Sequence, residues 1–186
     1  MAILSFAHDV LLLDASSAIS LYASGKMREI IEALPVKVAI VADVRRDEVL
    51  YFKRKGERNS TWEKASIDLQ PLIEQGLLTE VNLIAEDYEM MVNFDALNLD
   101  SGESFTAAVA LRCNWAICVD EKRATKRFPN AIPQIQLVST LQIFQHWVKE
   151  AQVTKEEVWL VLQKIWGRDE PLQKDPFFLW WQTYFY

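Results

Sequence analysis

The chain has 186 residues, of which 51% are hydrophobic and 25% are charged. This composition is typical of globular proteins, and a chain of this length can bury a core without disulfides, which excludes disordered, fibrous and disulfide-scaffold classes. The formal net charge of −6 argues against binding to nucleic acid through overall charge alone, although clustered carboxylates would themselves lower the pI.

Short apolar runs alternate with helix-forming segments along the chain. In chain order, the predicted elements are a strand over 9–14, a serine-capped helix ending at Gly25, a helix over 26–34, a strand over 36–41, a helix over 43–52, an exposed loop over 53–60, a helix over 61–70, a strand over 77–84, helices over 86–97 and 101–111, a strand over 115–119, a helix over 121–128, a strand over 134–138, and helices over 140–149 and 155–166. Ser16 or Ser17 is expected to cap the first helix, Asp43 the third, and Asp100 or Ser101 a later one.

Strands that alternate with helices predict an α/β fold with a mostly parallel sheet between helical layers. We expect a main domain over 1–148 and a helical, aromatic-rich extension over 149–186. Seven of the last ten residues are aromatic, so the tail is expected to pack across the domain or a neighbouring subunit. A second copy of the chain, in a homodimer, is therefore one candidate partner.

The lengths of the apolar runs and the spacing of the cysteines indicate in which cellular compartment the protein is expected. No uninterrupted apolar run exceeds five residues, so no segment is expected to span a membrane. The two cysteines form no CxxC pair, which disfavours a zinc ribbon and fits a reducing compartment. We expect a cytoplasmic protein.

Four carboxylates lie where predicted strands end or early in predicted helices. Asp14 and Asp120 each end a predicted strand, and the carboxyl ends of parallel strands meet at the edge where such sheets bind ligands. Glu48 and Glu103 lie early in two helices, from which they can reach the same edge. Like charges about 3–5 Å apart repel by a few kcal/mol. A hard divalent cation, Mg²⁺ or Mn²⁺, would neutralise such a cluster.

Each acid also has an ordinary structural explanation. Asp14 and Asp120 can begin a turn or cap a helix, and Glu103 in a first turn complements the helix dipole. Glu48 is by itself an unremarkable helix carboxylate. The hypothesis of a metal site therefore depends on the order and context of all four acids.

The chain resembles the PIN-domain nucleases in four segments. The matching segments are Leu11–Ser16, Val44–Val49, Leu99–Glu103 leading to Ala110, and Cys118–Ala124. It is most similar to the subgroup with an Asp-x-Gly-Glu stretch before the helix of the third acid. The resemblance covers residues 9–139. It implies a three-layer α/β/α fold and metal-dependent cleavage of RNA, less often of DNA.

The resemblance also implies roles for individual residues. Four acids would be catalytic and bind Mg²⁺ or Mn²⁺: Asp14, Glu48, Glu103 and Asp120. Ser16 would support the first acid. Glu103 keeps the family's seven-residue spacing before Ala110 and so matches the third acid, but Asp100 is a rival or an additional metal ligand.

Basic and aromatic residues border these acids. The candidate phosphate-binding residues are Arg45, Lys122, Arg123, Lys126 and Arg127, with a further cluster at Lys53, Arg54, Lys55 and Arg58. A solvated helix face is an equally good interpretation of these charges. Tyr51, Phe52 and Trp62 are candidates for stacking bases, although aromatic residues at such spacing more often lie in a core.

The main hypothesis is a Mg²⁺- or Mn²⁺-dependent endoribonuclease. Because many small PIN proteins are toxins, the resemblance also implies an antitoxin partner for which the aromatic tail would be the docking surface. The alternative is a non-catalytic module of the same fold that binds RNA or a protein. A phosphatase-like enzyme is disfavoured, because Ser16 stands where a second aspartate would be needed. The chain departs from the family in its acidic pI, its tail and the insertion over 53–84.

Overall fold

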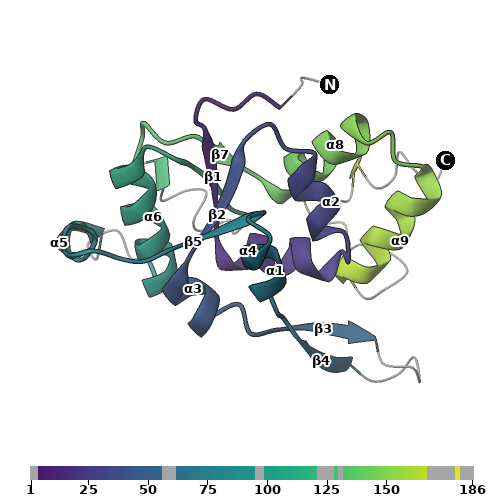
Figure 1. Ribbon diagram of the computed structural model, residues 1–186, viewed down its shortest axis with the longest axis horizontal. Coiled ribbons are helices and arrows are strands. Elements are labelled where there is room, and N and C mark those ends of the chain that lie inside the picture. Colours follow the sequence, from purple (N-terminus) through teal and green to yellow (C-terminus); the bar gives the residue numbers. More distant parts are fainter. Residues whose placement is uncertain are drawn as a thin grey trace.

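A five-stranded sheet lies between two groups of helices (Figure 1). The computed structural model describes residues 4–55, 62–94, 99–120, 128–129, 132–166 and 179–180. The strands of the sheet, in spatial order, are β5 (Leu78–Val81), β2 (Lys37–Val41), β1 (Val10–Leu13), β6 (Ala116–Cys118) and β7 (Leu137–Val138). All the neighbouring pairs are parallel. The predicted three-layer α/β/α fold is thereby confirmed.

Helices cover both faces of the sheet (Figure 1). One layer consists of α1 (Ala15–Ala23), α2 (Met27–Glu32), α8 (Thr140–Glu150) and α9 (Lys155–Trp166). The other consists of α3 (Ala42–Asp47), α5 (Ala85–Phe94) and α6 (Ser101–Cys113), and the short α4 (Gln70–Glu74) precedes β5 at the sheet edge. Within the described residues, no helix is long and apolar enough to cross a membrane.

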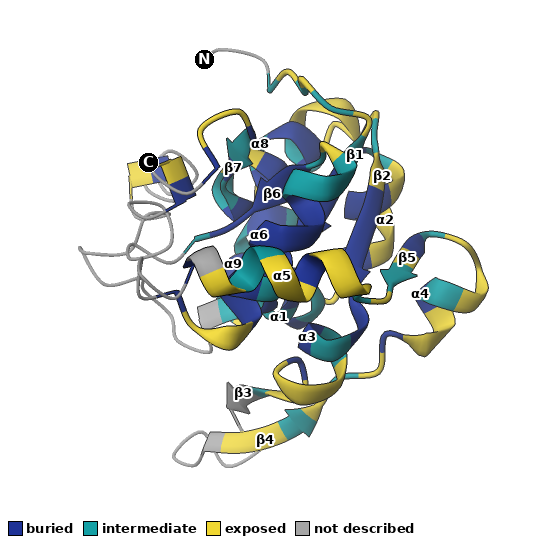
Figure 2. Cartoon of the chain, turned by 90° about the vertical axis from the view of Figure 1, so that its left-hand side faces the viewer, coloured by how far each residue is buried: buried dark blue, intermediate teal, exposed yellow. Residues whose placement is uncertain are grey.

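The central strand is buried on both of its faces (Figure 2). Leu11, Leu12 and Leu13 of β1 are all fully buried, which explains why the run is continuously aliphatic rather than alternating. Ala107 and Ala110 of α6, which belongs to the layer of α3 and α5, are fully buried. Their small side chains let α6 pack closely against β1 and β2. The carboxyl ends of β1, β2 and β6 therefore lie together at one edge.

The C-terminal segments share this core. Val158 and Leu162 of α9 are buried, and α9 contacts α1. Trp180 is also buried in the same hydrophobic cluster. The predicted boundary between residues 148 and 149 falls within α8. The remaining tail residues lie outside the described residues.

Residues 43–70 differ from the sequence prediction. Helix α3 ends at Asp47, and the chain then forms an antiparallel ribbon of β3 (Tyr51–Lys55) and β4 (Trp62–Ser66). The predicted helix over 43–52 is therefore confirmed only as far as Asp47, whereas the predicted loop over 53–60 and helix over 61–70 are wrong at 53–55 and 62–66, which form strands. The apolar and aromatic run before residue 53 favours a strand, and Phe52 packs edge to face on Tyr22 of α1, with ring centroids 6.0 Å apart.

Two predicted caps also change. Asp14, rather than Ser16 or Ser17, occupies the N-cap position of α1, and Val41 rather than Asp43 occupies that of α3. Asp43 lies in the first turn of α3, where its charge still complements the helix dipole. The predicted helix over 121–128 falls almost entirely outside the described residues.

Candidate active site

The end of β1 delivers a buried carboxylate to the edge of the sheet. Asp14 is 6% exposed, and its backbone N–H donates to the carbonyl of Cys118 in β6. The hydroxyl of Ser16 donates to Asp14 Oδ2 at 2.9 Å. Burial raises the pKa of the Asp14 carboxyl, against the hydrogen bonds from Ser16 and backbone N–H groups, and the charge of Asp100 raises it further. Ser16 therefore orients the Asp14 carboxylate, as the sequence predicts.

Glu48 follows the last residue of α3 and faces the start of α6. A β-carbon at Gly102 would lie 2.1 Å from Glu48 Oε1, so the carboxylate rests against the bare Cα of this glycine. This contact removes water from the carboxylate although the residue as a whole is exposed. Partial desolvation, followed by the charges of Asp100 and Asp14, raises the pKa of Glu48 to about 6.

The first turn of α6 holds two more carboxylates in a capping box. Asp100 Oδ1 accepts a hydrogen bond from the Glu103 backbone N–H at 2.8 Å, and Glu103 Oε2 accepts one from the Asp100 N–H at 3.0 Å. Glu103 is 4% exposed, whereas Asp100 is exposed. Both charges raise the pKa of Glu48, so both lie within electrostatic range of it. The capping box explains Glu103 structurally and leaves either acid as the candidate third acid.

Asp120 has a structural partner that the sequence does not indicate. Its Oδ1 accepts a hydrogen bond at 2.8 Å from the backbone N–H of Thr140, the first residue of α8. It thereby satisfies a helix N–H that has no partner within the helix. Desolvation, and then the charges of Asp120 and Asp14, raise the pKa of the buried Cys118 thiol, so both carboxylates lie within electrostatic range of it.

The carboxylates share an electrostatic environment but do not form a completed coordination shell. Among the residues that the structure describes, no three Asp, Glu, His or Cys side chains are placed as ligands of a single ion. The donors nevertheless suit a hard divalent cation, because all are carboxylate oxygens; burial, and after it their mutual repulsion, raises the pKa of Asp14 and of Glu48.

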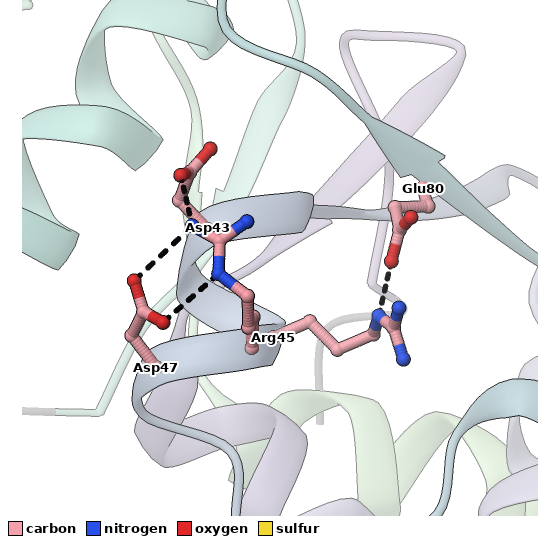
Figure 3. Close-up of polar contacts among 5 residues, drawn as sticks. Asp43, Arg45, Asp47 and Glu80 are labelled. Atoms are coloured by element: carbon pink, nitrogen blue, oxygen red, sulfur yellow. Dashed lines mark hydrogen bonds and ion pairs between the residues drawn. The ribbon is translucent and has the colours of Figure 1, made fainter.

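The nearest cations on α3 are already paired (Figure 3). The Nε of Arg45, a candidate phosphate ligand, donates to Glu80 of β5. Arg46 donates to Asp43 and Asp47 on its own helix. The other candidate phosphate ligands, Lys122, Arg123, Lys126 and Arg127, lie outside the described residues. Within the described part of the chain, α3 therefore presents no unpaired arginine to a phosphate.

Two structural features near the candidate site escape the sequence analysis. One is the contact between Gly102 and Glu48, for which the only signal is a glycine placed directly before Glu103 in the Asp-x-Gly-Glu stretch. The other is the β3–β4 ribbon, signalled by the apolar and aromatic run over 49–52. Comparison with models of known protein families and with curated proteins finds no match for the chain.

Proposed function

We propose that the protein is a Mg²⁺- or Mn²⁺-dependent endoribonuclease that hydrolyses phosphodiester bonds at the carboxyl edge of its sheet. The observation that carries the proposal is the grouping of Asp14, Glu48, Asp100 and Glu103 there, with two pKa values raised partly by mutual repulsion. Bringing several negative charges together costs free energy unless a cation neutralises them. The resemblance to PIN-domain nucleases supplies the choice of RNA as substrate.

The chain's own residues would prepare the site in defined ways. Asp14, held by Ser16 and backbone N–H groups, presents a fixed carboxylate, and Asp120 is fixed by the Thr140 N–H. These carboxylates would hold a divalent ion, which would lower the pKa of a water and stabilise negative charge on the phosphate. In the ion-free protein, the Glu48 carboxyl takes up a proton as the pH falls through about 6, so protons compete with the ion.

Thermal unfolding in EDTA, Mg²⁺ and Mn²⁺ tests the cation site directly. A ligand that binds only the native state stabilises it by about 2.7 kcal/mol at a hundredfold excess over Kd. We expect a Mn²⁺-dependent rise in melting temperature that is lost in Asp14→Asn. The matched control is Asp9→Asn, which makes the same chemical change next to the opposite, amino end of β1. An equal shift in Asp14→Asn would reject the assignment of Asp14.

Cleavage of labelled RNA tests the reaction. Wild-type protein should cut it in Mn²⁺ and not in EDTA, Asp14→Asn and Glu48→Gln should be inactive, and Asp9→Asn should keep wild-type activity. Full activity of Asp14→Asn would exclude the proposed mechanism.

A non-catalytic module that binds RNA or a protein is the second candidate. One observation favours it, namely that no three of the described acids are placed as ligands of one ion. This candidate predicts no Mn²⁺-dependent stabilisation and no cleavage, with RNA or protein binding unchanged by Asp14→Asn.

The toxin role, the antitoxin, the homodimer and the cytoplasmic location stay predictions. Copurification of a small partner and growth arrest on expression would support the toxin role.

A further inference from the structure

Three exposed apolar side chains form a row along α5. Ile84, directly before the helix, and Tyr88 and Val92 within it are spaced four residues apart and so lie along one side of it. They are 41%, 53% and 71% exposed. The other large hydrophobic residues that are exposed in the described part of the chain do not share a helix face with one another. We call the row of Ile84, Tyr88 and Val92 the α5 ridge.

Another side of α5 is fixed to α6. Asp87 is fully buried and accepts hydrogen bonds from Arg112 of α6 at 2.7 and 3.0 Å, and from the backbone N–H of Ile84 at 2.9 Å. Phe94, at the end of α5, is buried in the hydrophobic core. These contacts hold the ridge in place, and Figure 2 shows α5 in front of α6 with exposed residues along it. The ridge is therefore a fixed surface that another protein can reach.

Negative charge borders the α5 ridge. Glu89 lies three residues before Val92 and three residues after Glu86, so these side chains are neighbours on the helix surface. Both glutamates are exposed, and α5 contains no lysine or arginine. Two like charges at this spacing weaken a helix slightly. A cationic group beside them would remove that repulsion, so the charges next to the ridge favour a basic partner.

The shape of the ridge fits another helix. Side chains four residues apart form the ridges that enter the grooves of a partner in the commonest class of helix packing. A second copy of the chain is a poor occupant, because it would bring another net charge of −6 and a second set of these glutamates. A stable homodimer also buries about 800 Å² on each partner, more than three side chains on a helix about 15 Å long provide.

We infer that the α5 ridge docks a short amphipathic helix of another protein. The apolar side chains of that helix pack against Tyr88 and Val92, and its lysines or arginines face Glu89. The ridge belongs to a different surface from the candidate active site, because α6 lies between α5 and the sheet (Figure 1). The inference therefore goes beyond the proposed function and does not depend on it.

Fluorescence anisotropy of a fluorescein-labelled peptide tests the inference. The probe is a peptide of about 18 residues, long enough to form a helix in water, with leucines four residues apart and lysines beside them. A matched peptide carries glutamate in place of each lysine. Wild-type protein in about 0.15 M salt should bind the lysine peptide at least about tenfold more tightly than the glutamate peptide. No binding of the lysine peptide, or equal binding of both peptides, would overturn the inference.

Two apolar substitutions locate the bound peptide. Tyr88→Ala/Val92→Ala should bind the lysine peptide at least about tenfold more weakly, because two apolar contacts are lost. Alanine favours a helix, so this double variant should melt no lower than wild type. The matched control is Leu160→Ala, which removes an exposed leucine from α9 and should leave the affinity unchanged. An equal loss in Leu160→Ala, or no loss in the double variant, would contradict docking on the ridge.

Glu89→Gln tests the charge separately. It should weaken binding of the lysine peptide by about two- to fivefold and reduce its salt dependence, whereas Glu156→Gln, at an exposed position of α9, should do neither. Equal losses in both variants would reject the inference, because net charge rather than the ridge would then decide. Sedimentation tests the second copy: a wild-type dimer that Tyr88→Ala/Val92→Ala converts to a monomer would show that the inferred partner helix is the wrong occupant.

Failure of this inference is distinguishable from failure of the proposed function. The Mn²⁺-dependent rise in melting temperature should be the same in Tyr88→Ala/Val92→Ala as in wild type. If that rise and RNA cleavage are observed but the lysine peptide does not bind, only the docking surface is rejected. If the peptide binds at the ridge but wild type shows no metal-dependent cleavage, the docking surface stands and the ribonuclease proposal fails.

Discussion

The Glu48 carboxylate occupies the space beside Gly102 that any other residue would fill with its side chain. A β-carbon at Gly102 would lie 2.1 Å from Oε1 and 2.6 Å from Cδ of Glu48. The contact joins the end of α3 to the first turn of α6, whose Asp100 and Glu103 also act on Glu48. A glycine at this position therefore lets the second and third candidate acids approach one another.

Gly102→Ala should displace Glu48 without unfolding the protein. The clash is with the far end of a flexible side chain, and alanine favours a helix over glycine by about 0.5–1 kcal/mol. We expect equal or slightly higher stability in EDTA, a Glu48 pKa nearer the ordinary value of 4.5, and weaker Mn²⁺ stabilisation. Calorimetry and NMR titration of Glu48 measure these effects. Ser101→Ala, on the same turn, is the control and should leave Mn²⁺ stabilisation intact.

The raised carboxyl pKa values predict that the ion-free protein loses stability as the pH rises. The pKa of Glu48 is about 6 in the folded state and 4.5 in the unfolded reference, so between these values the folded state binds more protons. Stability therefore falls with rising pH across this window. Because Glu48 is exposed, solvent screening limits its contribution to about 1 kcal/mol or less.

Urea unfolding in EDTA at pH 4.5 and pH 7 measures this effect, as the difference between wild type and Glu48→Gln. Relative to wild type, the variant should gain stability at pH 7. A difference between the two proteins that does not change with pH would contradict the raised pKa of Glu48.

Asp120 is expected to have separable structural and catalytic roles. Asp120→Asn keeps an oxygen that can accept from the Thr140 N–H, whereas Asp120→Ala leaves this N–H without its partner. The alanine variant should lose about 0.5–2 kcal/mol of unfolding free energy, as lost helix caps do, and the asparagine variant much less. Both should lose RNA cleavage. Activity in a stable Asp120→Asn protein would restrict Asp120 to its structural role.

The ion pair between α5 and α6 is expected to be a main source of stability away from the site. Asp87 is fully buried and accepts from Arg112 through both oxygens, at 2.7 and 3.0 Å, and from the Ile84 N–H. Arg112→Met leaves this charge buried without its partner, so urea unfolding should show a loss of about 3–5 kcal/mol. Glu86→Gln, an exposed neighbour, should change stability by less than about 0.5 kcal/mol. If Arg112→Met also lost less than about 0.5 kcal/mol, the buried Asp87 carboxylate would not need Arg112 as its partner.

Local patterns in the sequence were sufficient for the elements that form the sheet and its ends. The short aliphatic run of β1 favours a strand covered on both faces, and a carboxylate directly after such a strand lies at the carboxyl edge of the sheet. The capping pair of Asp100 and Glu103 is likewise readable, because its two hydrogen bonds join residues three apart. Such features depend on neighbours along the chain.

Tertiary structure decided the partners of the same residues. Glu48 faces Gly102, Arg45 is neutralised by Glu80, and Asp120 accepts a hydrogen bond from the start of α8. Each pair joins segments 20 to 54 residues apart, so no local pattern specifies it. The β3–β4 ribbon was mispredicted for the same reason, because the packing of Phe52 on a distant helix overrides the helical spacing of its own segment. The sequence by itself thus determined where the carboxylates leave the sheet, and tertiary contacts decided which groups surround them.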